Sequence, residues 1–141
     1  MVTFVGESSR EARHQPGVPI TFDWIEYLKL AKQLAGDKSA HSSEEAKLRS
    51  AVSRAYYAAF HKAQKVVFPD RLPEGFGSHR EVIDELQRSD DPSRRQIGVE
   101  MNRLQGDRKK ADYYDSINNL PRMAQDVLIS VEELISNLSR L

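Results

Sequence analysis

The stretch SSEEAKLRSAVSRAYYAAFHKAQKVVFP, residues 42–69, decides the fold because it predicts one long helix with a defined start and end. Ser42 and Glu45 have the spacing of a capping box, in which the two side chains bond the free N–H groups of the first turn. Pro69 ends the run because proline is excluded from a helix interior. We therefore expect a helix that begins after Ser42 and reaches about Val67.

One face of this helix is apolar and rich in small residues. With a turn of about 100° per residue, these side chains fall on one side of the helix. They are Leu48, Val52, Ala55, Ala59, Ala63 and Val66. Small side chains allow a neighbouring helix to approach closely, so this face is predicted to lie in the core.

Apolar residues recur at helical spacing in four further segments, which begin at Thr21, Ser78, Asp91 and Asn119. Ser78, Asp91 and Asn119 are of the types that cap helix starts, and Pro92 suits the first helical position. No segment alternates apolar and polar residues as a strand does. The predicted fold is all-α, an up-and-down antiparallel bundle of four to five helices.

Length and composition indicate one domain. A chain of 141 residues can bury a single core, and residues 1–18, which lack periodicity, are expected to form a flexible N-terminal arm before a bundle over residues 19–141. Cysteine is absent, which excludes disulfides and thiol chemistry. The chain shows neither a signal peptide nor an apolar run of about 20 residues, so we expect a cytoplasmic protein with no membrane contact.

The charges of the chain balance, with 21 basic and 21 acidic residues. A general attraction for nucleic acid is therefore missing, and any RNA binding must be local. Metal-ligand spacing, a glycine-rich phosphate loop and a Gly-x-Ser-x-Gly elbow are all absent from the sequence. We expect no metal site and no cofactor.

The segment RKKADYY, residues 108–114, concentrates cations, a carboxylate and phenols. In a binding role, Arg108, Lys109 and Lys110 form a cationic rim, Asp112 orients Arg108 from one turn away, and Tyr113 or Tyr114 stacks on a base. In a structural role, a buried Arg108–Asp112 pair fixes the approach to the last helix. Both roles are compatible.

Two alternatives remain for the local structure of this segment. Gly106-Asp107 either ends the preceding helix or bends it. If that helix continues, Arg108 extends the apolar stripe of Ile97, Met101 and Leu104 and points inward. An unpaired charge there is costly, so a paired Arg108 in a cleft follows.

Arg54, Tyr57 and His61 form a second candidate group on the opposite side of the long helix. Arg54 can hold a phosphate while His61 exchanges a proton near neutral pH. The alternative is that Tyr57 and His61 fill a bundle or dimer interface. His79 is expected to be a surface or packing residue without a catalytic role.

Three separated motifs, LRSAVSRAYYAAFH (48–61), GSHR (77–80) and RKKADY (108–113), closely resemble those of small stand-alone prokaryotic HEPN-domain proteins. The resemblance covers roughly residues 43–138. It implies a helical bundle that forms a homodimer, encoded beside a nucleotidyltransferase partner in toxin-antitoxin or defence systems. Active members of the family are metal-independent endoribonucleases.

The family signature is an arginine followed, after four to six residues, by a histidine. Arg108 matches the arginine, but Tyr113 stands at the histidine position and no histidine follows His79. A phenol with a pKa of about 10 is a poor base at neutral pH. Two hypotheses therefore remain: an RNA- or nucleotide-binding protein, with Arg108 and His61 as the catalytic pair if it cleaves RNA, or a non-catalytic module that binds a nucleotidyltransferase or another protein.

Overall fold

The structure, a computed structural model, describes residues 22–39, 43–75 and 77–141. This part of the chain contains five helices and no strand, which confirms the predicted all-α class. The helices are α2 (Ile25–Gly36), α3 (Glu44–Val67), α4 (Ser78–Gln87), α5 (Pro92–Tyr113) and α6 (Leu120–Leu138). The predicted arm of residues 1–18, and the predicted start positions Thr21 and Ser42, lie outside the described residues.

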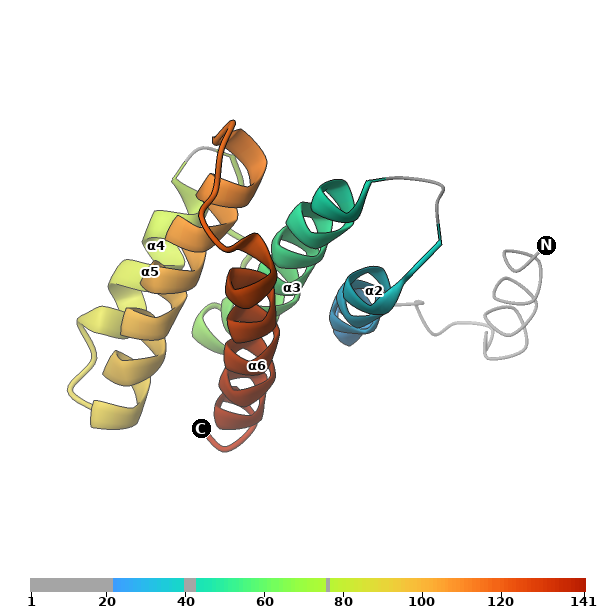
Figure 1. Cartoon of the computed structure of the whole chain (residues 1–141). Helices are drawn as coiled ribbons and strands as arrows, with labels where there is room; N and C mark the ends of the chain where they lie inside the picture. Colours follow the sequence, from blue (N-terminus) through green and yellow to red (C-terminus); the bar gives the residue numbers. More distant parts are fainter. Residues whose placement is uncertain (1–21, 40–42, 76) are drawn as a thin grey trace, which may run out of the picture.

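Helix α3 is central, and each of the other four helices packs against it. Figure 1 shows α2 on one side of α3, α6 across it, and the α4–α5 pair on the other side. The predicted small-residue face is buried, except that Val66 is only partly covered. Burial extends beyond that face to Tyr56, Ala58 and Phe60. Alanines on several sides of α3 allow this packing from several directions.

The starts of the helices match the predictions in part. Ser43, one residue later than expected, caps α3 by accepting a hydrogen bond from the Ala46 N–H at 3.0 Å. Asp91 caps α5 as predicted, since its Oδ1 accepts from the Ser93 N–H at 3.0 Å. The prediction for Ser78 was wrong, because α4 is preceded by Gly77 in a left-handed conformation (φ 88°) and has no side-chain cap.

Helix α6 begins after Asn119, as predicted, but this residue does not cap through its side chain. Its backbone is left-handed, with φ 52°. Asparagine tolerates this conformation better than most residues.

Helix α5 does not end at Gly106-Asp107 but continues to Tyr113. Of the alternatives for this segment, the continuous helix is the one observed. Arg108 accordingly follows Ile97, Met101 and Leu104 on the buried face. The prediction that Arg108 points inward is confirmed.

Helices α4 and α5 lie side by side (Figure 1), and they approach closely at Gly98, which faces the end of α4. A Cβ added at Gly98 would lie 2.8 Å from Cγ of Gln87 and 3.0 Å from Cβ of Leu86. Only glycine leaves room for this contact. The contact fixes the position of α4, whose first turn contributes to the site described below.

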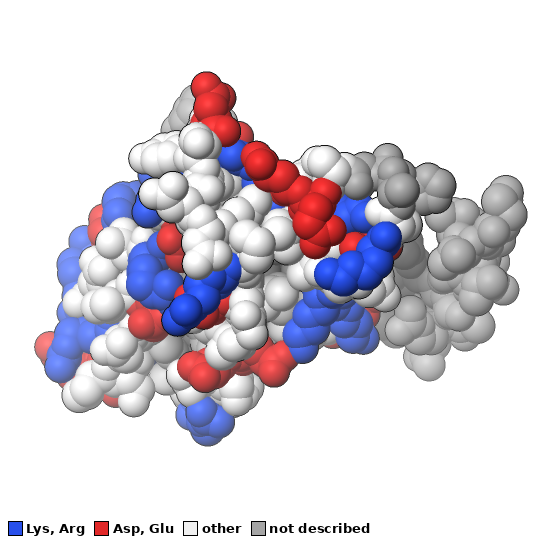
Figure 2. All heavy atoms as spheres, in the orientation of Figure 1, with Lys and Arg blue, Asp and Glu red and all other residues white. Residues whose placement is uncertain are grey.

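The surface carries both signs of charge. Figure 2 shows basic and acidic side chains interspersed over the face that it displays, in keeping with the balanced composition. None of the helices in the described ranges combines the length and apolar character that crossing a bilayer requires.

We predict opposite effects for alanine at two glycines of α5. Gly98→Ala should lower the free energy of unfolding by about 1–3 kcal/mol, because the new methyl group overpacks the contact with α4. Gly106→Ala should raise it by about 0.5–1 kcal/mol, because this exposed helical position has open space around it. Urea denaturation measures both. A Gly98→Ala variant as stable as the parent would contradict the close approach.

Candidate functional site

Arg108 is the centre of the candidate site. Helix α5 carries it into the interior, where the residue is only 8% exposed. Its Nη1 donates to Oδ2 of Asp112 at 3.2 Å, whereas its Nε is buried without a hydrogen-bond partner in the described ranges. Buried N–H groups are nearly always paired because an unpaired one costs about 1–3 kcal/mol. The described residues therefore satisfy the guanidinium only in part.

Two tyrosines of α3 lie beside this guanidinium. Its Cζ is 5.6 Å from the ring centroids of both Tyr56 and Tyr57, within the range of a cation–π interaction. Burial alone would lower the pKa of Arg108, but Tyr57 and the Asp112 carboxylate outweigh it and raise the pKa above its usual value. Arg108 is therefore always charged.

A hollow of about 590 Å³ opens next to Arg108. Its described lining residues are Tyr57, Gly75, Gly77, His79, Arg80, Gln105, Arg108, Lys109 and Tyr113. Three of them are cationic and none is acidic. The volume lies within the range of about 300–1,000 Å³ typical of small-molecule sites. The arrangement suits an anion that carries a flat group.

His79, which was expected to be a surface or packing residue, also lines this hollow. Its Nδ1 is 2.7 Å from the hydroxyl of Tyr56, and its ring stacks on Phe60 with centroids 4.0 Å apart. Burial, followed by the positive charge of Arg108, lowers the pKa of His79 to about 4. His79 is therefore neutral at pH 7 and offers one donor and one acceptor.

The structure groups some of the predicted site residues and separates others. Tyr57, Lys109 and Tyr113 line the hollow with Arg108, and Asp112 holds the guanidinium from α5. His61 is not among the lining residues. Its ring stacks on that of Trp24, the residue before α2, with centroids 3.5 Å apart, so His61 packs within the bundle.

Arg54 is also absent from the lining of the hollow. Its Cζ lies 5.1 Å from the Tyr27 ring of α2, and the residue is exposed. Tyr57 links the two groups, since its ring lies 6.3 Å from that of His61 and beside Arg108. Arg54 and His61 thus contact aromatic residues of α2, on a surface that adjoins the hollow through Tyr57.

The end of α5, which carries the site, is tied to α3 by Arg49. Its Nη1 donates to the carbonyls of Ala111 at 3.0 Å and Tyr114 at 2.5 Å. These bonds satisfy carbonyls that a helix end leaves free, and a cation is favourable there. Ser53 of α3 also approaches Asp112, with Oγ 3.5 Å from Oδ2. The position of Arg108 is therefore fixed from two helices.

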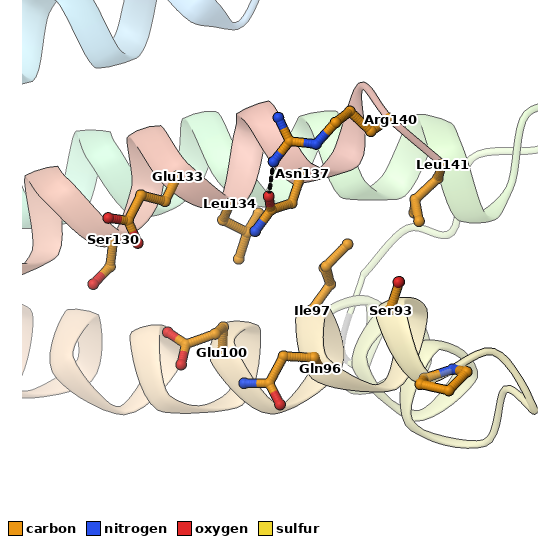
Figure 3. Close-up of a pocket in the computed structure, with 11 residues that line it drawn as sticks. Ser93, Gln96, Ile97, Glu100, Ser130, Glu133, Leu134, Asn137, Arg140 and Leu141 are labelled. Atoms are coloured by element: carbon orange, nitrogen blue, oxygen red, sulfur yellow. Dashed lines mark hydrogen bonds between the residues drawn. The ribbon is translucent and has the colours of Figure 1, made fainter.

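A second hollow, of about 430 Å³, lies between the start of α5 and the end of α6 (Figure 3). It mixes the acids Glu100 and Glu133 with Arg140, and Arg140 donates to the Asn137 side chain. No buried polar atom without a partner is found there among the described residues. We therefore take the hollow at Arg108 as the candidate site.

Comparison with known proteins adds no identification: no family model, no curated protein and no solved structure matches this chain significantly. In the described ranges, no cluster of three or more histidine, aspartate or glutamate side chains is placed to hold a metal ion. Functional inference therefore depends on the geometry of the site.

We predict an acid-sensitive stability that depends on His79. Because its pKa falls from 6.5 to about 4 on folding, the unfolded chain binds a proton between these pH values that the folded chain does not. The free energy of unfolding should therefore rise with pH across this window and level off above it. Urea denaturation at several pH values measures the effect.

His79→Gln should reduce this pH dependence. Part of it should remain, because burial also lowers the pKa of His61. The same pH dependence in the variant and the parent would show that His79 is not buried as described.

Proposed function

We propose that this chain is an RNA- or nucleotide-binding protein of the HEPN type and that Arg108 and its hollow are the binding site. The observation that carries the proposal is the charged Arg108 side chain, which is nine-tenths buried, has no partner for its Nε among the described residues and adjoins a hollow whose described lining includes no acidic residue. Replacing a buried ion pair by apolar residues is often neutral or stabilising, so stability alone does not account for a guanidinium at this place. A phosphate in the hollow would offer acceptor oxygens to the guanidinium.

The other lining residues support the same class of ligand. Lys109 and Arg80 add positive charge, and Tyr57 and Tyr113 provide aromatic faces for a base. Tyr113 is 74% exposed, so its ring is free to stack. Because the whole chain is neutral, binding depends on this local group of cations, as the composition predicts.

RNA cleavage has less support than binding. Attack by the ribose 2′-hydroxyl requires a base that accepts a proton near neutral pH. In this chain Tyr113 stands at the family's histidine position, His61 stacks on Trp24, and the pKa of His79 is about 4. The proposed catalytic pair of Arg108 and His61 would need a His61, from this copy or from a second copy in a homodimer, that leaves its stack on Trp24 and enters the hollow.

A second candidate function is a protein-binding module, for instance for a nucleotidyltransferase. The observation that favours it is the exposure of neighbouring aromatic residues at the end of α5, where Tyr113 is 74% and Tyr114 55% exposed. Exposed tyrosines are enriched at protein interfaces. In this alternative no nucleic acid binds.

We predict that Arg108→Met weakens the binding of single-stranded RNA at low salt by at least about tenfold, because it removes a buried charge-assisted donor. Arg108→Lys should also weaken binding, since it keeps the charge but loses the planar fork. Fluorescence anisotropy with a labelled RNA measures both. In the parent, each contacted phosphate should contribute about 0.7 to the slope of log affinity against log salt, giving a shallow slope.

Arg122→Met provides the matched control, because Arg122 on α6 is 73% exposed in its side chain and lies outside the lining of the hollow. It makes the same change in net charge and should leave the affinity unchanged. Circular dichroism establishes that each variant is folded. Absence of RNA and nucleotide binding by the parent would refute the proposal and favour the protein-binding module; equal affinity in Arg108→Met and the parent would exclude this hollow.

A further inference from the structure

The first turn of α4 forms one wall of the hollow. Gly77 precedes the helix in a left-handed conformation and no side chain caps it. The N–H of Ser78 bonds to the Gly75 carbonyl at 3.3 Å, but the N–H of His79 has no backbone acceptor in the described ranges. Free N–H groups and the helix dipole favour an anion at such a start.

Arg108 is an independent sign of a ligand at this place. Its side chain is nine-tenths buried, its Nε has no partner among the described residues, and it lines the same hollow as the first turn of α4. Arg80 contributes a further cation, although its Nε also bonds Oδ1 of Asp84 at 3.0 Å. Two groups that favour an anion thus face one space from different helices.

His79 adds a donor whose tautomer is fixed by its neighbour. Tyr56 is fully buried, and its hydroxyl has Nδ1 of His79 as its partner at 2.7 Å. If Nδ1 donated to this hydroxyl, the buried phenol proton would have no acceptor, which is costly. The phenol therefore donates to Nδ1, and the proton of the neutral imidazole lies on Nε2.

From these contacts we infer a subsite for a phosphate monoester at the start of α4, where the His79 N–H groups and the Arg108 guanidinium donate to the phosphate oxygens. The base then lies towards Tyr57 and Tyr113. This inference rests on the proposed nucleotide binding. It adds the orientation of the bound nucleotide and specifies that its phosphate is a monoester. The phosphate belongs either to a free nucleotide or to the 5′ end of an RNA strand.

The test compares ligands that differ only in a terminal phosphate. Calorimetry on the full chain should show that AMP binds at least about tenfold more tightly than adenosine, and that pApApA binds more tightly than ApApA by a similar factor. Preference for AMP alone would assign the site to free nucleotides, and preference for both to phosphorylated ends. Equal affinities within both pairs would overturn the subsite while leaving RNA binding intact.

The ratio of adenosine to AMP affinity tests whether His79 contacts the phosphate. His79→Phe keeps a ring to stack on Phe60 but removes the donor, so the ratio of adenosine to AMP dissociation constants should fall by at least about threefold. Arg122→Met should leave this ratio unchanged. A purely structural role for His79 would weaken both ligands equally, and an unchanged ratio would overturn the assignment.

A second variant provides the same test if His79→Phe does not fold. If His79→Phe unfolds because the Tyr56 hydroxyl loses its partner, the double variant Tyr56→Phe/His79→Phe removes that unpaired group. The double variant should show the same fall in the ratio. If neither AMP, adenosine nor RNA binds the parent, the proposed function fails as well, which separates that outcome from failure of the subsite alone.

Discussion

Packing of four helices around the alanine-rich α3 is the constraint on which the rest of the structure depends. Ala51, Ala55, Ala59 and Ala63 are fully buried and leave little side-chain volume between α3 and its neighbours. Interhelical distance is set by the side chains at the contact, so small residues bring the helices close. Helix α3 therefore presents Tyr56 and Tyr57 at short range to side chains from α4 and α5.

The charge of Arg108 is the main cost of this arrangement. Transfer of a guanidinium to the interior is unfavourable, and the Asp112 carboxylate and the two tyrosine rings oppose this effect, so that the pKa of Arg108 stays raised. Asp112 holds the guanidinium from one turn away, but Asp112 is itself exposed and both residues lie on α5, so the pair is not the buried link to the last helix that the structural interpretation of the sequence supposed. The Nε of Arg108 has no partner among the residues that the structure describes, and a hollow adjoins the side chain, so the pair with Asp112 does not use all of its donors. The pairing with Asp112 and the proposed binding role thus involve the same residue.

Local signals predicted much of the fold. The start of α5 at Asp91-Pro92 and the inward direction of Arg108 follow from spacing along one helix, which depends only on helical geometry. The start of α4 was missed because a left-handed Gly77 takes the place of a side-chain cap. A helix can begin after a capping serine or after a left-handed glycine. Because Ser78 directly follows Gly77, the sequence does not distinguish the two.

Contacts between helices could not be predicted from such local signals. The place of His79 depends on how α4 meets Tyr56 and Phe60 of α3, and the stacking of His61 on Trp24 joins segments 37 residues apart. The only sequence sign for His79 was its position in a first turn after two glycines, which is weak by itself. The residue types of the site were therefore predictable, but the selection of His79 over His61 was not.

The most direct test of the central claim is the NMR signal of the Arg108 Nε–H group in arginine-labelled protein, assigned by its loss in Arg108→Lys. We predict that addition of AMP shifts this signal along a saturable binding curve, because the unpaired N–H belongs to a guanidinium that meets the phosphate. An unshifted Arg108 signal, while the signals of other arginines follow the binding curve, would contradict the account.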